Sequence, residues 1–109
     1  MTVCLLASCS QRHTAIALAE DFIEQNAMAP EAMEQRDFSQ LGTTSRLNDS
    51  IIASLRERAS EFYRQGISYP AYQQGDTLFY IRMRFVHQGD TLSHTFYIDN
   101  QLEHVVAVK

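Results

Sequence analysis

Two histidines, His94 and His104, are the residues in this 109-residue sequence with the most obvious capacity for chemistry. They stand in consecutive segments, Thr91–Asp99 and Leu102–Val108, whose apolar and polar residues alternate as in half-buried β-strands. A three-residue loop at Asp99-Asn100-Gln101 would make the two imidazoles diagonal neighbours on one apolar sheet face. Such a pair could bind a ligand or exchange protons near neutral pH.

The segment Thr77–His87 alternates in the same way, and the dipeptide Gln88-Gly89 that follows it suits a two-residue hairpin loop. This loop would bring apolar residues of both strands onto one face, pairing Phe79 with Ile98, Ile81 with Phe96, Met83 with His94 and Phe85 with Leu92. A slip by one residue would move the whole set to the other face, so the register is well specified. We therefore take Met83, His94 and His104 as candidate ligand-binding residues.

Two interpretations of the histidines remain open. In the first, His94 or His104 is the general base of a small pocket enzyme of the isomerase or dehydratase type, which requires a second polar group that the sequence does not identify. In the second, which we favour, each imidazole lies near the core margin with local hydrogen bonds. Two histidines alone make a poor metal site, so we expect neither a metal nor another cofactor and no catalytic residue is assigned.

The opposite face of the same strands carries tyrosine and arginine side chains, which are common at interaction hot spots. The candidate residues of this surface are Tyr80, Arg82, Arg84 and Tyr97, with Glu103 beside them. One interpretation is a surface for a protein partner or for a second copy of the chain. The other is a solvated face with cross-strand pairs such as Tyr80 beside Tyr97.

Two amphipathic segments, Thr14–Met28 and Asp49–Gln65, are predicted to be helices, the second capped by Asn48. Arg56 is expected on a solvated helix face, where truncation to alanine would cost no more than ~0.5 kcal/mol. The predicted fold is α+β: two N-terminal helices packed on one face of a four-stranded antiparallel meander. The expected core comprises Leu55, Phe79, Ile81, Phe85 and Phe96.

The remaining segments carry weaker patterns. Pro30 favours a short helical turn reaching Gln35, and the glycine- and hydroxyl-rich stretch Asp37–Asn48 is predicted to be a loop. Ile67–Gln73 is predicted to be an edge strand, because Pro70 has no amide hydrogen to donate to a neighbouring strand.

The N-terminus contains an apolar run, Val3 to Leu6, then Ala7-Ser8-Cys9 and an abrupt change to polar residues. This resembles the signal of bacterial lipoproteins, although it has no basic leader and its apolar run is short. The resemblance implies cleavage before Cys9, a lipid on its thiol, and a lipid-anchored protein of the periplasm or outer membrane. Residues 1–12 would then be a signal remnant and tether, and residues 13–109 a single domain.

The expected order of helices and strands resembles the cystatin-like and nuclear-transport-factor-like α+β families, which include both enzymes and silent binding modules. Fold alone cannot decide between these. The net charge of −4 and the absence of a basic run argue against nucleic-acid binding. The leading hypothesis is a lipid-anchored envelope protein with a small non-catalytic binding domain, and the pocket enzyme is the alternative.

Overall fold

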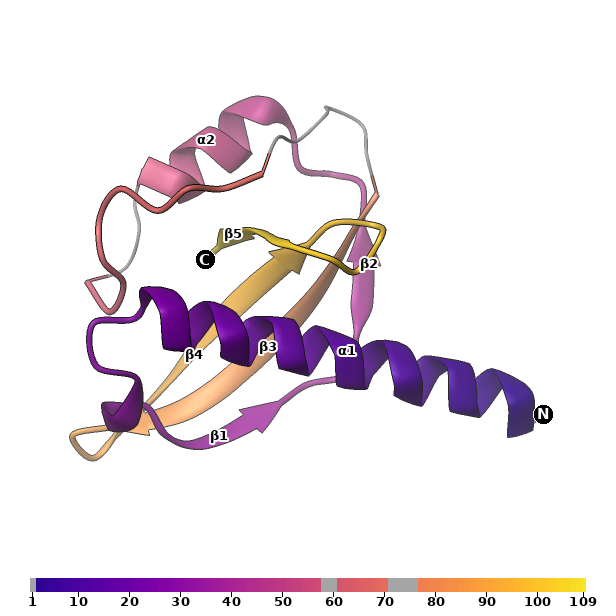
Figure 1. Cartoon of the computed structure of the whole chain (residues 1–109), viewed down its shortest axis with the longest axis horizontal. Coiled ribbons are helices and arrows are strands. Elements are labelled where there is room, and N and C mark those ends of the chain that lie inside the picture. Colours follow the sequence, from indigo (N-terminus) through magenta and orange to yellow (C-terminus); the bar gives the residue numbers. More distant parts are fainter. Residues whose placement is uncertain (1, 58–60, 71–76) are drawn as a thin grey trace.

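The computed structural model describes residues 2–57, 61–70 and 77–109, and side chains from residue 10 onward. It is an α+β fold with two helices and a five-stranded antiparallel sheet (Figure 1). The elements are α1 (Thr2–Asn26), a 3₁₀ turn (Pro30–Ala32), β1 (Glu34–Phe38), β2 (Gly42–Thr44), α2 (Asp49–Glu57), β3 (Leu78–His87), β4 (Asp90–Ile98) and β5 (Val105–Val108). The α+β class is confirmed, but the sheet has one strand more than predicted, and α2 lies mid-chain between β2 and β3.

The β3–β4 hairpin has the predicted register. Phe79 lies opposite Ile98, and Phe85 opposite Leu92, with every intervening pair in step. Gln88 and Gly89 close the hairpin with φ values of 51° and 84°. Two successive positive φ values are what a two-residue turn needs to match the twist of its strands.

β1 and β2 are the strands that the sequence pattern missed, because the region was predicted to be a helical turn and a loop. Both pair with the same edge of β3, β1 near its end and β2 near its beginning. β1 is mostly polar and exposed, and a register shift between Glu34 and Asp37 interrupts it where Gln35 has a φ of 52°. Its residues therefore lack the alternation that marks a half-buried strand.

α1 begins at Thr2, twelve residues before the predicted start at Thr14. The Thr14 hydroxyl does not cap the helix but donates to the Ser10 carbonyl, 3.0 Å away within it. Arg12 donates from its guanidinium to the carbonyls of Phe38 and Ser39, at 2.8 and 3.0 Å. The predicted apolar face is confirmed by the buried residues Ala15, Ala19, Phe22 and Ile23. In the described part of the chain, no helix has the length and apolarity needed to span a membrane.

α2 spans Asp49–Glu57, and the helix does not reach Gln65 as predicted, because residues 61–65 are not helical; residues 58–60 lie outside the described part of the chain. Its start is confirmed, because the Asn48 side-chain oxygen accepts a hydrogen bond from the Ile51 amide at 2.9 Å. The later apolar residues leave the helix. Tyr63 forms an isolated β-bridge with Ala27 at the end of α1, and its side chain enters the core.

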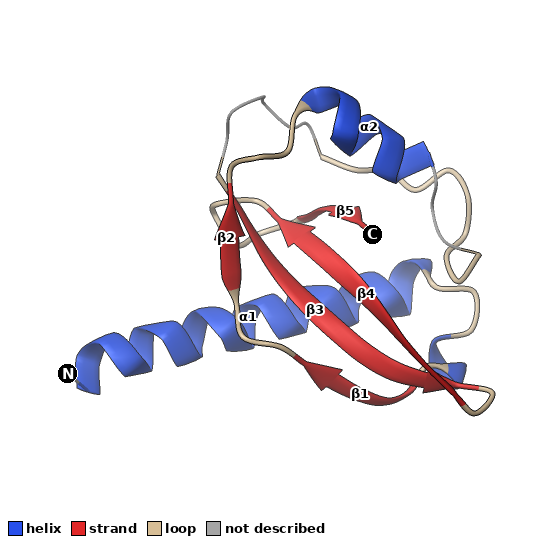
Figure 2. Cartoon of the chain, turned by 180° about the vertical axis from the view of Figure 1, so that it is seen from behind, coloured by secondary structure: helices blue, strands red, loops and turns tan. Residues whose placement is uncertain are grey.

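The two helices cover opposite faces of the sheet, which corrects the prediction that both cover one. We call the face that bears Ile81, Met83 and Phe85 the inner face; it packs against α1. The opposite, outer face packs at one end against α2, whose Ile52 and Leu55 contact Leu78. Figures 1 and 2 show α1 crossing the sheet and α2 beside β5.

β5 begins at Val105, three residues later than predicted, and carries a bulge. Ile98 pairs with Val105, whereas the next pair is Tyr97 with Ala107, so Val106 is the extra residue. A bulge sets two residues against one and re-aims the side chains. All four residues of β5 are buried: Val105 and Val108 in the inner cluster, and Val106 and Ala107 in the α2 cluster.

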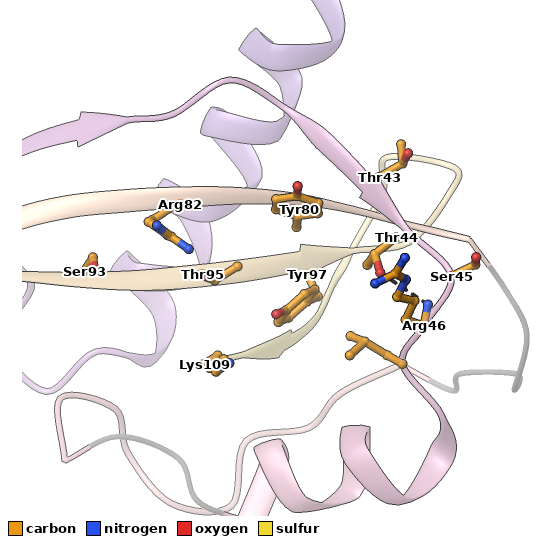
Figure 3. A pocket seen from close by; sticks show the side chains of 11 residues that line it. Thr43, Thr44, Ser45, Arg46, Tyr80, Arg82, Ser93, Thr95, Tyr97 and Lys109 are labelled. Carbon is orange, nitrogen blue, oxygen red and sulfur yellow. Dashed lines mark hydrogen bonds between the residues drawn. The ribbon is translucent and has the colours of Figure 1, made fainter.

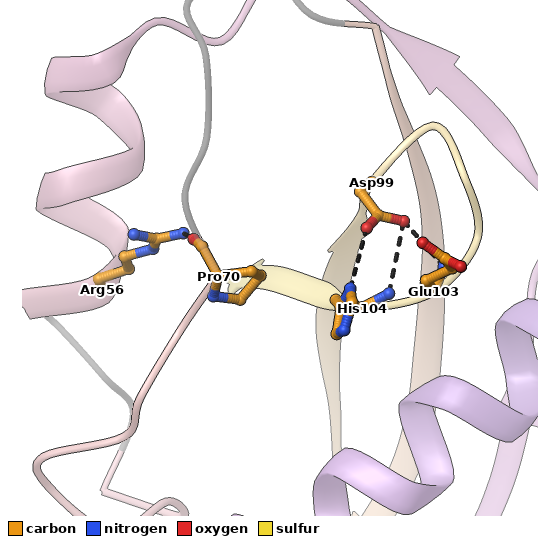
Figure 4. Close-up of polar contacts among 5 residues, drawn as sticks. All are labelled: Arg56, Pro70, Asp99, Glu103 and His104. Carbon is orange, nitrogen blue, oxygen red and sulfur yellow. Dashed lines mark hydrogen bonds and ion pairs between the residues drawn. The ribbon is translucent and has the colours of Figure 1, made fainter.

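The predicted edge strand is not formed by Ile67, Ser68, Tyr69 or Pro70, and the rest of it lies outside the described residues. This segment instead provides a partner for Arg56. The Arg56 guanidinium donates to the Pro70 carbonyl at 2.7 Å (Figure 4). It also donates to the Val106 carbonyl at 2.9 Å and stacks over the Tyr69 ring at 4.8 Å. Arg56 therefore links α2 to β5. The prediction that it lies on a solvated helix face is wrong.

We expect Arg56→Ala to lower the free energy of unfolding by about 1–3 kcal/mol, because two charge-assisted hydrogen bonds and a cation–π contact are lost together. Urea denaturation measures the effect. Glu57→Ala, at the adjacent exposed position of α2, is the matched control and should change stability by less than about 0.5 kcal/mol. Equal denaturation midpoints for the two variants would contradict the role of Arg56.

Candidate ligand-binding site

His94 lies inside the core and is only 7% exposed. Its Nδ1 is 3.0 Å from the Tyr63 hydroxyl, and the rings of Phe62 and Phe85 surround it at centroid distances of 5.4 and 4.9 Å. Burial lowers the pKa of His94 to about 4 and raises the pKa of Tyr63. The pair is therefore a neutral hydrogen bond at physiological pH.

His104 does not lie beside His94, because the longer loop before β5 removes it from the strand. Met83 and His94 are paired across the hairpin in the core, whereas His104 is exposed in the loop between β4 and β5. The Asp99 carboxylate accounts for the length of this loop. It accepts hydrogen bonds from the Glu103 and His104 amides at 2.8 and 3.4 Å and contacts His104 Nδ1 at 3.2 Å (Figure 4).

Asp99, Glu103 and His104 bring potential metal-ligand atoms within 4.8 Å of one another, a cluster that the sequence reading did not find. The prediction had placed His104 in a strand, away from the Asp99 side chain. Both oxygens of Asp99 are already engaged inside the loop. The cluster is thus accounted for by loop closure, and we assign no ligand to it.

The outer face holds an open groove of about 950 Å³, which we call the outer groove (Figure 3). Its lining residues are Thr43, Thr44, Ser45, Arg46, Leu47, Tyr80, Arg82, Ser93, Thr95, Tyr97 and Lys109. Three of the four predicted surface residues are among them. The fourth, Arg84, does not line the groove, and its guanidinium forms an exposed ion pair with Asp37 at 3.1 Å.

Strand pairing aligns the residues of the groove floor. Arg82 lies opposite Thr95, and Thr95 in turn exchanges backbone hydrogen bonds of 2.9 and 3.1 Å with Lys109. Laterally paired residues of adjacent strands point to the same face, so Arg82, Thr95 and Lys109 form a row across the sheet. Tyr80 and Tyr97 form the next row, with ring centroids 6.4 Å apart.

The groove wall is formed by β2 and the residues after it. The backbone amide of Arg46 donates to the Thr44 hydroxyl at 3.3 Å, and Figure 3 shows the Arg46 side chain next to Thr44. This wall was not predicted, because the segment looked like a loop. The one available signal was Gly42, whose missing side chain permits a close approach to another group.

Gly42 lies opposite Tyr80, and a Cβ atom at this position would collide with the outer end of the tyrosine ring. We expect Gly42→Ala to displace the Tyr80 ring from its position beside Tyr97 at little cost in stability, because the ring is 36% exposed and can turn outward. NMR of the tyrosine ring protons measures the displacement. Thr43→Ala, at the next residue of β2, is the control. Unchanged Tyr80 ring shifts in Gly42→Ala would contradict the predicted contact.

Among the described residues, the cations of the outer groove differ from most of those outside it. Outside the groove, Arg12 and Arg56 bind backbone carbonyls and Arg36 and Arg84 pair with carboxylates, and only Arg64 has no such side-chain partner. Within the described residues, no acidic side chain forms an ion pair with the groove cations, which are Arg46, Arg82 and Lys109.

Tyr97 reports the electrostatics of the groove floor. Burial raises the pKa of Tyr97, whereas the nearby positive charge of Arg82 lowers it. None of the lining residues is acidic, although the whole chain carries a net charge of −4. The outer groove is therefore a positively charged hollow in an acidic protein.

Comparisons with protein-family models, with curated proteins and with solved structures found no match to this chain. The function must therefore be argued from the geometry of the site itself.

Proposed function

We propose that the protein is a non-catalytic binding domain and that its ligand or partner occupies the outer groove. The observation that carries this proposal is the convergence of Tyr80, Arg82 and Tyr97 with unpaired cations in one accessible hollow. Tyrosine and arginine provide large contact areas and directional hydrogen bonds, which suits them to recognition.

The alternative of a pocket enzyme has less support. A general base must reach its substrate, and the neutral His94 is enclosed by Phe62, Tyr63 and Phe85 with its Nδ1 already hydrogen-bonded. His104 is accessible, but the carboxylate of its described polar partner, Asp99, is engaged in closing the loop.

A titration monitored by amide NMR tests the binding proposal. The probes are small aromatic compounds with anionic, neutral or cationic substituents. We expect the amides of Arg82, Thr95 and Tyr97 to shift with at least one probe, and Tyr97→Ala to remove the response. Shifts centred on Tyr63 and His94, or no shifts in the groove with any probe, would overturn the proposal.

We further propose that Cys9 carries a lipid that anchors the domain in the bacterial cell envelope. The support is the Ala7-Ser8-Cys9 box after an apolar run. Metabolic labelling of the natural protein with a fatty acid should mark the chain, and Cys9→Ser should abolish the label. A label that persists in the variant, or its absence from the natural protein, would refute the anchor.

The likeness to cystatin-like and nuclear-transport-factor-like domains also stays a proposal. Its support is coarse: a long first helix packed on an antiparallel sheet. The second helix, α2, packs on the outer face with β5, whereas the predicted layout had both helices on one face.

A further inference from the structure

We infer that the outer groove binds a small molecule that carries a phosphate group next to a flat ring. This inference rests on the proposed function and specifies its ligand. It follows from the charge of the groove, from the hydrogen-bond donors around it and from the two tyrosines on its floor.

The distribution of charge favours an anion. Eight lysine and arginine residues lie in the described part of the chain, and the side chains of four of them form no hydrogen bond or ion pair there: Arg46, Arg64, Arg82 and Lys109. Three of these four line the outer groove. The three cations line one groove that has no acidic lining residue, and like charges repel one another, so their accumulation is explained best by a ligand that neutralises them.

The groove also supplies neutral donors. Serine and threonine hydroxyls line it from two segments: Ser45 after β2, and Ser93 and Thr95 on β4. Hydroxyls and guanidinium groups donate to phosphate oxygens, and the arginine fork can bind two of them at once. A dianionic phosphate monoester matches several cations better than a carboxylate, which carries a single charge.

The two tyrosines on the groove floor favour a ligand that contains a flat ring. Tyr80 and Tyr97 lie beside one another with their rings inclined by 49°, and Arg82 is on the same face of the sheet. Aromatic side chains provide apolar, flat surfaces against which a ring can pack. The groove volume of about 950 Å³ lies within the range of small-molecule sites, which supports a compact ligand in preference to a folded partner.

Four probes that share a benzene ring and differ in charge test the inference by NMR titration. They are phenyl phosphate, phenyl sulfate, benzyl alcohol and benzylamine. We expect binding to decrease in that order, with phenyl phosphate weakened by added salt because the contact is between charges. Equal binding of benzyl alcohol and phenyl phosphate in the groove would overturn the inference but leave the proposed binding function intact. No response in the groove to any probe would overturn both.

Arginine variants localise the anion. Arg82→Gln and Arg46→Gln should each weaken phenyl phosphate binding by about tenfold, because each removes a charged donor. Arg64→Gln removes an exposed cation outside the groove and is the matched control, expected to bind as the original does. If Arg64→Gln weakened binding as much as Arg82→Gln, the effect would be one of net charge and the site would be refuted.

The phosphate could belong to a free metabolite or to a lipid headgroup, and vesicles distinguish these sources. Phosphatidylglycerol carries a phosphodiester without a ring, so sedimentation with its vesicles that Arg82→Gln abolishes would assign the groove to a lipid headgroup and overturn the ring-bearing ligand. Binding to phenyl phosphate without vesicle binding would support the site and assign a soluble ligand. Vesicle binding retained in Arg82→Gln, together with phenyl phosphate binding unaffected by it, would overturn the inference.

Discussion

Replacing Phe96 with alanine should lower the free energy of unfolding by about 3–5 kcal/mol, the largest effect of any single substitution considered. Phe96 is fully buried on β4, between Ile81 on β3 and Val108 on β5, and its ring meets the edge of Phe22 on α1 at 6.1 Å. Truncation loses the transfer free energy of the ring and leaves a cavity that three strands and a helix border, so the surroundings can collapse only in part.

Leu92→Ala is the matched control on the same strand and the same face. Leu92 is 37% exposed, so its truncation should cost less than about 1 kcal/mol. Chemical denaturation measures both variants. The dependence of the free energy of unfolding on denaturant concentration should be compared as well, because a change in it would indicate an altered unfolded state. Similar midpoints for Phe96→Ala and Leu92→Ala would show that β4 does not lie in the core as described.

Acidification should destabilise the protein through His94. The pKa of His94 is about 4 in the folded chain, below the value of 6.5 for an unperturbed imidazole, so the unfolded chain binds more protons between these pH values. The contribution of neutral His94 to the free energy of unfolding is therefore fully present above pH ~6.5. It decreases as the pH falls, and the loss reaches roughly 3 kcal/mol near pH 4. The physical cause is the burial of a charge among aromatic rings.

The variant His94→Gln isolates this contribution. Glutamine can still accept a hydrogen bond from the Tyr63 hydroxyl, but it does not titrate. The free energy of unfolding of the original protein should fall more steeply between pH 6.5 and 4 than that of the variant. The two proteins differ only at residue 94, so the contributions of all other residues cancel in the difference. Parallel pH profiles would show that His94 is not the buried, neutral group described.

The β3–β4 hairpin could be predicted in full because two local signals agreed. Glycine at position 89 set the turn, and the apolar residues of both strands then fell on one face. The start of α2 was equally local, since Asn48 caps it through its own side chain. Where short-range chemistry determines the conformation, reading the sequence was sufficient.

The errors arose where partners distant in the sequence decide the outcome. β1 is polar and interrupted, and pairing with the edge of β3 makes it a strand. Tyr63 continues the apolar stripe of α2 but leaves the helix to bond His94 and to pair with Ala27. The bulge in β5 similarly depends on its two packing partners and has no pattern of its own.

The candidate site was predictable only in part for the same reason. Alternation along β3 and β4 placed Tyr80, Arg82 and Tyr97 together on the outer face. The wall that makes this face a groove comes from the segment around Thr44 and Arg46, whose position depends on β2. His104 was displaced because the Asp99 side chain, not a strand register, organises its loop.

β5 has a consequence for how the molecule opens. Its four residues divide between the core under α1 and the smaller core under α2, so neither core is complete without this short strand. Detachment of β5 would expose Val105 and Val108 on one side and Val106 and Ala107 on the other at the same moment. We therefore expect the two cores to unfold as one cooperative unit, with amide hydrogen exchange in β4 and in α2 governed by a shared opening event.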